Sequence, residues 1–220
     1  QMAEKPAETI AAIARMGYEG VEGGPPKGMG NAEFKKLLAD NGLKHVSGGT
    51  SFADLKDNLA KTLDSCAELG IDTLMIGWIK NEVDKRGGDW TKLVPELKDV
   101  CARAAEAGLR ILYHNHAYEF EMKVGDRYAL DYIYDNIPAE HLKAQIDTYW
   151  VKTGGEDPVA YVRKYAQRIP LLHIKDRAPK PQDETCPFAE IGHGVLDWDG
   201  IFAAAQGGAI EWYLVEQDRW

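Results

Sequence analysis

The chain has 220 residues, 45% of them hydrophobic, which is enough for one large core. Its formal net charge of -9 argues against a general affinity for nucleic acid or for anionic membrane surfaces. No run approaches the roughly 18 apolar residues that a bilayer-spanning helix needs, and the N-terminus carries no apolar signal segment.

The first half of the chain repeats one pattern: a helix with an apolar stripe, a glycine, then a short apolar strand. The helices are expected at 6–16, 31–41, 55–69 and 93–104, and the strands at 18–22, 43–46, 73–79 and from 109 onward. The glycines are Gly17, Gly42, Gly70 and Gly108. Glycine suits the left-handed position that often follows a helix. Pro6 suits the start of the first helix, and Asn31 is placed to cap the second.

The second half keeps the same rhythm. Helices are expected at 128–134, 158–165 and 198–205, and strands at 142–147, 169–176 and 212–216. Seven strands alternating with helices predict a parallel sheet and, at this length, an α/β (β/α)8 TIM barrel. The chain starts on a helix and stops at the end of a strand. Residues 1–220 are therefore expected to form a single, incomplete barrel domain that lacks its first strand and last helix, with a gap in the wall.

The cysteines do not suggest disulfides or a thiolate metal site, because there are three and they are scattered. Cys66 and Cys101 fall on helical apolar stripes and are expected in the core. Cys186 lies in a polar, proline-containing loop, where an isolated thiol is expected to be incidental.

Polar and aromatic side chains collect where the strands end, at the rim that carries the active site in barrels. They are Glu22, Trp78, His114 with His116, Asp147, His173 with Lys175, and Glu216. Side chains two apart on a strand share a face, so His114 and His116 are expected to point the same way. Glu119 follows just beyond, in an expected loop. One such residue would be a solvated or capping group, but several together predict a site.

The residue types favour a metal. Aspartate, glutamate and neutral imidazole are ligands for a divalent cation such as Mn, Co, Zn or Mg, and no thiolate is offered. Carboxylates crowded on one rim repel one another, which either raises a pKa or recruits a cation. A metal site therefore fits better than a bare acid/base pair.

Several motifs follow one another at strand-to-strand spacing over nearly the whole chain. They are His114-Asn115-His116 with Glu119-Phe120, Ile146-Asp147-Thr148, Leu172-His173-Ile174-Lys175-Asp176, Glu190-Ile191-Gly192 with Gly194, Asp197-Trp198, and Val215-Glu216-Gln217-Asp218. As an ordered set they resemble the sugar phosphate isomerase/epimerase family of xylose isomerase-like TIM barrels. The resemblance implies a divalent metal held by Glu, Asp, His and Glu from four strands, which binds vicinal oxygens of a sugar.

Three of the ligands implied by the resemblance match directly: Asp147, His173 and Glu216. Many relatives carry Leu-Glu-Asn where this chain has Tyr-His-Asn, so His114 occupies the place of the glutamate. The fourth ligand is then either His114 or Glu119 reaching back from the loop. Glu119 is preferred, which leaves His114 and His116 for substrate binding or proton transfer.

The implied chemistry begins with removal of a proton next to a sugar carbonyl, because a cation on both oxygens stabilises the resulting enediolate. Glu216 or a neutral histidine would take the proton, and a second group would return it on the other face. The preferred function is therefore an isomerase or epimerase acting on a sugar, keto sugar or sugar phosphate. A dehydratase or lyase with the same site is one alternative, and a non-catalytic sugar-binding or accessory subunit is another.

Four further residues are candidates for substrate binding: Glu22, Trp78, Lys175 and His193. Lys175 is expected to point away from the barrel axis, and a structural pairing with Asp176 or a neighbour is as well supported as a substrate role. The Gly192-His193-Gly194 segment could approach a phosphate or sugar hydroxyl, or only shape a turn. Trp78 could stack on a sugar ring, although burial in the core is preferred.

The expected partner is a small sugar, with no nucleic acid and no membrane, and a homo-oligomer is left open. An endonuclease IV-like phosphodiesterase is disfavoured because it needs a basic face for the duplex. A cytoplasmic location is expected, with a periplasmic or secreted one left open because a signal could have preceded residue 1.

Overall fold

Seven short strands form the wall of a barrel in a computed structural model that describes residues 4–179 and 188–218. They are β1 (Gly20–Glu22), β2 (Lys44–Thr50), β3 (Thr73–Ile76), β4 (Arg110–His114), β7 (Lys143–Gln145), β8 (Leu171–Ile174) and β11 (Trp212–Val215). Strands β1, β2, β3, β4 and β7 pair in that order, all parallel. A parallel bridge from Asp147 to His173 joins β7 to β8, which pairs in parallel with β11. The predicted barrel and its sequential strand order are confirmed.

The outer edges of β1 and β11 carry no strand among the residues that the structure describes. A groove of about 1160 Å³ lies between them, and its lining includes Glu22, His173 and Glu216. The groove therefore opens onto the rim where the polar residues were expected to gather.

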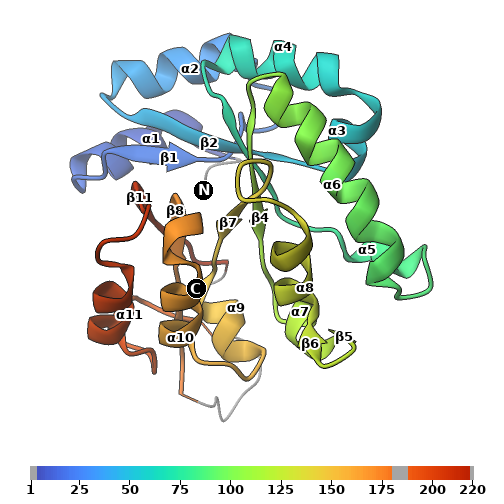
Figure 1. Cartoon of the computed structure of the whole chain (residues 1–220). Coiled ribbons are helices and arrows are strands. Elements are labelled where there is room, and N and C mark those ends of the chain that lie inside the picture. Colours follow the sequence, from blue (N-terminus) through green and yellow to red (C-terminus); the bar gives the residue numbers. More distant parts are fainter. Residues whose placement is uncertain (1–3, 180–187, 219–220) are drawn as a thin grey trace.

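Helices cover the outside of the wall, as Figure 1 shows. They are α1 (Pro6–Arg15), α2 (Asn31–Asp40), α3 (Phe52–Asp57), α4 (Leu59–Leu69), α5 (Lys80–Asp84), α6 (Trp90–Glu106), α7 (Tyr118–Glu121), α8 (Ala129–Asn136), α9 (Thr148–Thr153), α10 (Pro158–Tyr165) and α11 (Trp198–Ala205), with a 3₁₀ turn at Ala166–Arg168. Two antiparallel pairs lie outside the wall: β5 (Lys123–Val124) with β6 (Arg127–Tyr128), and β9 (Asp176–Arg177) with β10 (Phe188–Ala189). No helix in the described ranges is long and apolar enough to span a membrane.

The predicted glycines at the ends of four helices are confirmed, but two helix predictions are wrong. Gly17, Gly42, Gly70 and Gly108 all have positive φ, between +70° and +92°. The helix expected at 55–69 is two helices, because Asn58 has non-helical dihedrals and Ser51 caps a separate first helix through the Asp54 N–H. Asn31 does not cap α2. Its side chain donates instead to Ser65 and Glu68 of α4, and so ties the two helices together.

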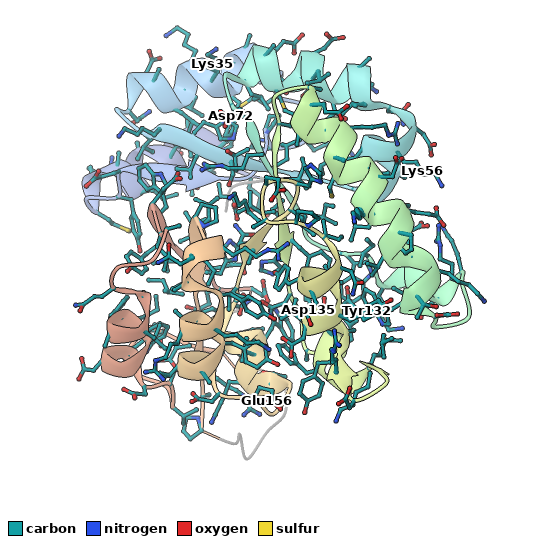
Figure 2. The ribbon with its side chains drawn as sticks, in the orientation of Figure 1. Lys35, Lys56, Asp72, Tyr132, Asp135 and Glu156 are labelled. Atoms are coloured by element: carbon teal, nitrogen blue, oxygen red, sulfur yellow. The ribbon has the colours of Figure 1, made fainter. Side chains whose placement is uncertain are left out.

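The apolar core has two parts that matter for the site. The larger fills the space between wall and helices and contains Cys66 and Cys101, as predicted, whereas Cys186 lies outside the described residues. A smaller cluster of Leu112, Leu171 and Leu214 forms an apolar layer contributed by β4, β8 and β11. Some charged side chains pair on the outer surface: Lys56, labelled in Figure 2, pairs with Glu96 of α6 at 2.9 Å.

Candidate functional site

Four polar side chains meet next to the apolar layer of Leu112, Leu171 and Leu214, toward the C-terminal ends of the strands. They are His114, Asp147, His173 and Glu216, and their potential ligand atoms all lie within 4.8 Å of one another. Three of them follow a leucine of the layer by two residues, the interval that returns a strand to the same face. The first three are buried, and Glu216 keeps 37% of its side chain exposed. The strands therefore place a polar cluster directly next to an apolar layer.

His173 lies at the centre of the cluster, between two carboxylates. Its Nε2 is 2.6 Å from Glu22 Oε1, and its Nδ1 is 3.2 Å from Glu216 Oε2. Burial by itself would lower the pKa of His173, but the hydrogen bonds to both carboxylates raise it to about 10. Burial also opposes ionisation of Glu216, yet contact with His173 and Lys175 holds the pKa of Glu216 well below its ordinary value.

The two carboxylate oxygens of Asp147 have different surroundings. Oδ1 accepts a hydrogen bond of 2.9 Å from the Trp150 N–H and so caps α9. Oδ2 is buried without a hydrogen-bond partner. Burial raises the pKa of Asp147, against the opposing charges of Lys175 and His173. One oxygen is therefore fixed by the fold while the other faces the cluster.

The two histidines of the first motif continue the cluster along β4. The ring of His114 lies 4.7 Å from that of His173 and 5.0 Å from that of His116. Burial lowers the pKa of both, well below the usual value for His114 and to about 4 for His116. Both rings are therefore neutral near pH 7, and the Nδ1 of each is buried without a partner.

Side chains beside the ligand candidates stitch neighbouring strands together. The Asn115 Oδ1 accepts a 3.0 Å hydrogen bond from the Asp147 N–H. The Thr148 hydroxyl lies 3.2 Å from the His173 carbonyl oxygen and 3.0 Å from that of Lys175, and it accepts a 3.1 Å bond from the Lys175 N–H. These roles of Asn115 and Thr148 were not predicted from the sequence. Each residue directly follows an inward-facing one and so points toward the neighbouring strand, which could have indicated the role.

Glu119 is not brought to the cluster, contrary to the preference for it as fourth ligand. It lies in the one-turn helix α7, where an open loop was expected. Its Oε1 accepts a hydrogen bond from the Tyr113 hydroxyl and its Oε2 accepts one from the His116 N–H, both at 2.8 Å. Both oxygens of Glu119 therefore accept hydrogen bonds from the β4 strand and the turn after it. His114, and not Glu119, lies beside Asp147, His173 and Glu216.

Burial of Glu119 gives the fold a pH dependence. Burial away from solvent raises the pKa of Glu119 to about 8, so the folded state favours its protonated form. The resulting contribution of Glu119 to the free energy of unfolding is fully present below the unfolded pKa near 4.5 and is lost as the pH rises through about 8. We expect the free energy of unfolding of the natural chain, relative to Glu119→Gln, to fall by about 3 kcal/mol between pH 5 and pH 9. Urea titrations of both proteins measure it, and parallel pH profiles would contradict the prediction.

Lys175 points into the site, contrary to the expected outward orientation. The strand ends at Ile174, so the alternation of a β-strand does not govern Lys175. The side chain is 1% exposed, and its Nζ lies 2.6 Å from Asp218, 3.3 Å from Glu216 and 3.9 Å from Asp147. It therefore pairs with neighbouring carboxylates, as one of the two expected roles required, although Asp176 is not among them. Its ammonium therefore neutralises carboxylates of the cluster.

Glu22 contacts His173 of the cluster, and Trp78 contacts the neighbouring His116. Glu22 accepts hydrogen bonds from Ser47 and from Gln145 in addition to its contact with His173, so it supports that histidine. Such a carboxylate behind an imidazole fixes the ring and its tautomer at metal sites. Trp78 is 49% exposed, which corrects the expectation of core burial, and its ring lies 5.0 Å from that of His116. Trp150, which sequence reasoning missed, lies 5.2 Å from His116.

The loop that carries His193 is shaped by Asp176. This buried carboxylate accepts hydrogen bonds from the backbone N–H groups of Gly192, Gly194 and Leu196 and from the Trp198 indole. A Cβ on Gly194 would lie 2.1 Å from Asp176 Oδ1, so the turn requires glycine. The glycines therefore shape a turn, and His193 is exposed on it, with no described contact to the cluster.

Replacement of Asp176 by asparagine tests the role of this carboxylate. We expect Asp176→Asn to lower the free energy of unfolding by about 2 to 4 kcal/mol, because an amide NH₂ would face two or more buried donors. Urea denaturation measures the change. Asp199→Asn, an exposed change on α11, is the matched control and should leave stability within about 0.5 kcal/mol. Equal stabilities for the two variants would refute this role.

A divalent cation fits the four-residue cluster. Its donors are two imidazoles and two carboxylates, the ligand types that Mn, Co and Zn accept. The unpartnered Asp147 Oδ2 and His114 Nδ1 would each gain a partner, and Glu22 already supports His173 from behind. The cluster could therefore hold a metal ion.

Comparisons with known proteins agree with the barrel fold. A family model described as xylose isomerase-like TIM barrel matches residues 10–218. An inosose dehydratase from Geobacillus thermodenitrificans is 23% identical over 246 residues, which cover 96% of this chain and 82% of that protein. Among solved structures, a sugar phosphate isomerase/epimerase from Parabacteroides distasonis has a TM-score of 0.76 at 21% identity, covering 99% of this chain and 82% of that one. A probable 3-DHS dehydratase from Bacillus anthracis has a TM-score of 0.67 at 12% identity, covering 96% and 86%. At these identities the structural matches show a shared fold.

Proposed function

Because the chain belongs to the xylose isomerase-like TIM barrel family, we propose that it is a divalent-metal-dependent lyase that removes water from a cyclic keto sugar or keto polyol. The observation that carries this proposal is the cluster of His114, Asp147, His173 and Glu216 on the active rim. The dehydratase names of two relatives favour elimination over isomerisation.

His114, Asp147, His173 and Glu216 would hold the cation, which when bound supplies Lewis acidity toward a carbonyl oxygen and a neighbouring hydroxyl. Lys175 neutralises part of the carboxylate charge of the same group. Glu22 keeps the His173 ring oriented through Nε2. These contacts keep the groups that meet the substrate in fixed positions.

Glu216 takes the proton from the carbon next to the carbonyl, because it alone of the four is not fully buried and its low pKa keeps it ionised. The electron pair of the broken C–H bond forms a carbon–carbon double bond as the β C–O bond breaks. The departing hydroxide takes the proton held by Glu216 and leaves as water. His116, a neutral imidazole beside the cluster, orients that hydroxyl by accepting its hydrogen bond at a ring nitrogen. No oxidant or reductant is required.

Isomerisation or epimerisation is the second candidate, because Glu216 of the cluster and His116 beside it are two proton-transfer groups. Glu216 comes from β11 and His116 from the turn after β4, so each could approach a different face of a bound ring. Return of the proton by His116 would then invert the carbon instead of eliminating water. The solved relative from Parabacteroides distasonis carries a name of this kind.

Incubation with a cyclic keto polyol such as an inosose, in deuterated water with Mn²⁺, tests the proposal by NMR. We expect loss of one water and a new vinylic signal in the product. Deuterium next to the carbonyl without loss of water would favour the epimerase. Neither change, with tight binding of the polyol, would select a non-catalytic sugar-binding protein.

A further inference from the structure

We propose that Glu119 is a positioning residue that clamps the turn carrying His116 and the aromatic wall beside it. The residue is fully buried, and both of its carboxylate oxygens are engaged. The proposal deepens the proposed function, on which it rests, because it names what keeps the substrate-facing side of the site in place.

The first half of the clamp fixes His116 relative to β4. The Tyr113 hydroxyl donates to Oε1 of Glu119, and the His116 N–H donates to Oε2, each at 2.8 Å. Tyr113 immediately precedes His114 on the strand, so one carboxylate bridges the strand and the turn beyond it. The two imidazoles are thereby held with their ring centres 5.0 Å apart.

The second half of the clamp reaches Trp78 through Tyr118, the neighbour of Glu119 in α7. The Tyr118 ring stacks against His116, with centres 6.0 Å apart and planes at 19°, and it meets the Trp78 ring edgewise at 5.1 Å. Its hydroxyl lies 3.3 Å from that of Tyr113 and accepts a 3.5 Å bond from the Ile79 N–H. The same short helix therefore supports both His116 and the loop after β3.

The wall that results has a defined chemistry. His116 offers a partly buried imidazole, of which a ring nitrogen can accept a hydrogen bond, and Trp78 offers a ring that is half exposed beside it. An acceptor next to an aromatic face suits a polyol ring, which presents hydroxyl groups at its edge and C–H bonds on its face. Displacement of the turn by about an ångström would therefore separate these two contacts from the four-residue cluster.

The clamp needs hydrogen-bonding atoms and not a charge. A glutamine at this position would accept from the His116 N–H with its oxygen and donate to the Tyr113 hydroxyl with its nitrogen. A methionine would fill a similar volume but offers no comparable acceptor. A metal-ligand role predicts a different outcome, because both changes would remove a ligand carboxylate.

The test compares Glu119→Met with Glu119→Gln in the full chain. For Glu119→Met we expect the Mn²⁺ dissociation constant to stay within about threefold, and kcat/KM on the keto polyol to fall about 10- to 100-fold. The amide of His116 should exchange its hydrogen about tenfold faster or more. Glu119→Gln should stay within about threefold of the natural chain in all three measurements.

Two outcomes would overturn the proposal. Loss of Mn²⁺ affinity by tenfold or more in either folded variant would make Glu119 a metal ligand, and unchanged His116 exchange in Glu119→Met would remove the clamp. If that variant does not fold, Tyr113→Phe breaks one of the two bonds and should show a smaller loss of His116 protection, whereas unchanged protection counts against the clamp. The exchange measurement needs no substrate, so a failure of the proposed reaction would be recognised separately.

Discussion

Replacement of Glu216 by glutamine is expected to lower turnover of the keto polyol by at least about 100-fold, even at saturating metal. The change removes the carboxylate that faces the open side of the cluster and would receive the substrate proton. It also removes one of the charged partners of Lys175 Nζ, 3.3 Å away, and of His173 Nδ1, 3.2 Å away. Steady-state kinetics with titrated Mn²⁺ would measure the loss and separate it from weaker metal binding.

The matched control lies at the other end of the same strand. Glu211 immediately precedes β11 and pairs with Arg110 at 2.6 Å on the rim opposite the cluster. Glu211→Gln removes the same charge from the same strand and should keep turnover within about twofold, because surface ion pairs contribute little. Near-normal turnover of Glu216→Gln at saturating metal would exclude proton abstraction by this residue.

Replacement of Asp147 by asparagine is expected to weaken divalent-cation binding by at least about 100-fold, because it replaces a carboxylate ligand by a neutral amide. Asparagine can still cap α9 through its side-chain oxygen, so the helix should survive. At a metal concentration of 100 times the dissociation constant, a bound ion stabilises the natural fold by about 2.7 kcal/mol. The variant should therefore lose most of its metal-induced rise in melting temperature.

Asp126→Asn serves as the control for that measurement, because Asp126 is exposed in the turn between β5 and β6. It should retain the full metal-induced rise. An Asp147→Asn protein that binds Mn²⁺ as tightly as the control would show that this carboxylate is not a ligand.

Much of the fold was predictable because it depends on local patterns. Helices α10 and α11 begin and end where the sequence places them, since Asp157 and Asp197 cap them and apolar stripes run along them. The seven strands follow from short apolar runs, four of which come shortly after a glycine that ends a helix. Helices α5, α7 and α9 were missed because each has six residues or fewer, too short to show a helical period.

The positions of the site residues that end a strand were predictable. The positions of residues outside the strands were not, because they depend on the local turn and on the side-chain conformation. Asp147, His173 and Glu216 come together because they end neighbouring strands. Glu119 was misplaced because its direction depends on the unforeseen turn α7. Lys175 was misplaced because its long side chain turns inward once the strand has ended. Asp176 bonds backbone groups 16 to 20 residues away, and no sequence pattern identified those partners.

The most direct test of the central claim is a crystal structure of the protein loaded with Mn²⁺, with the ion located by its anomalous scattering. We expect one ion per chain, bound at about 2.0 to 2.4 Å by nitrogen or oxygen atoms of His114, Asp147, His173 and Glu216. We also expect Glu119 to keep its bonds to Tyr113 and His116, so that the metal site is the one proposed. An ion coordinated by Glu119, or no ion at the rim at saturating Mn²⁺, would contradict this claim.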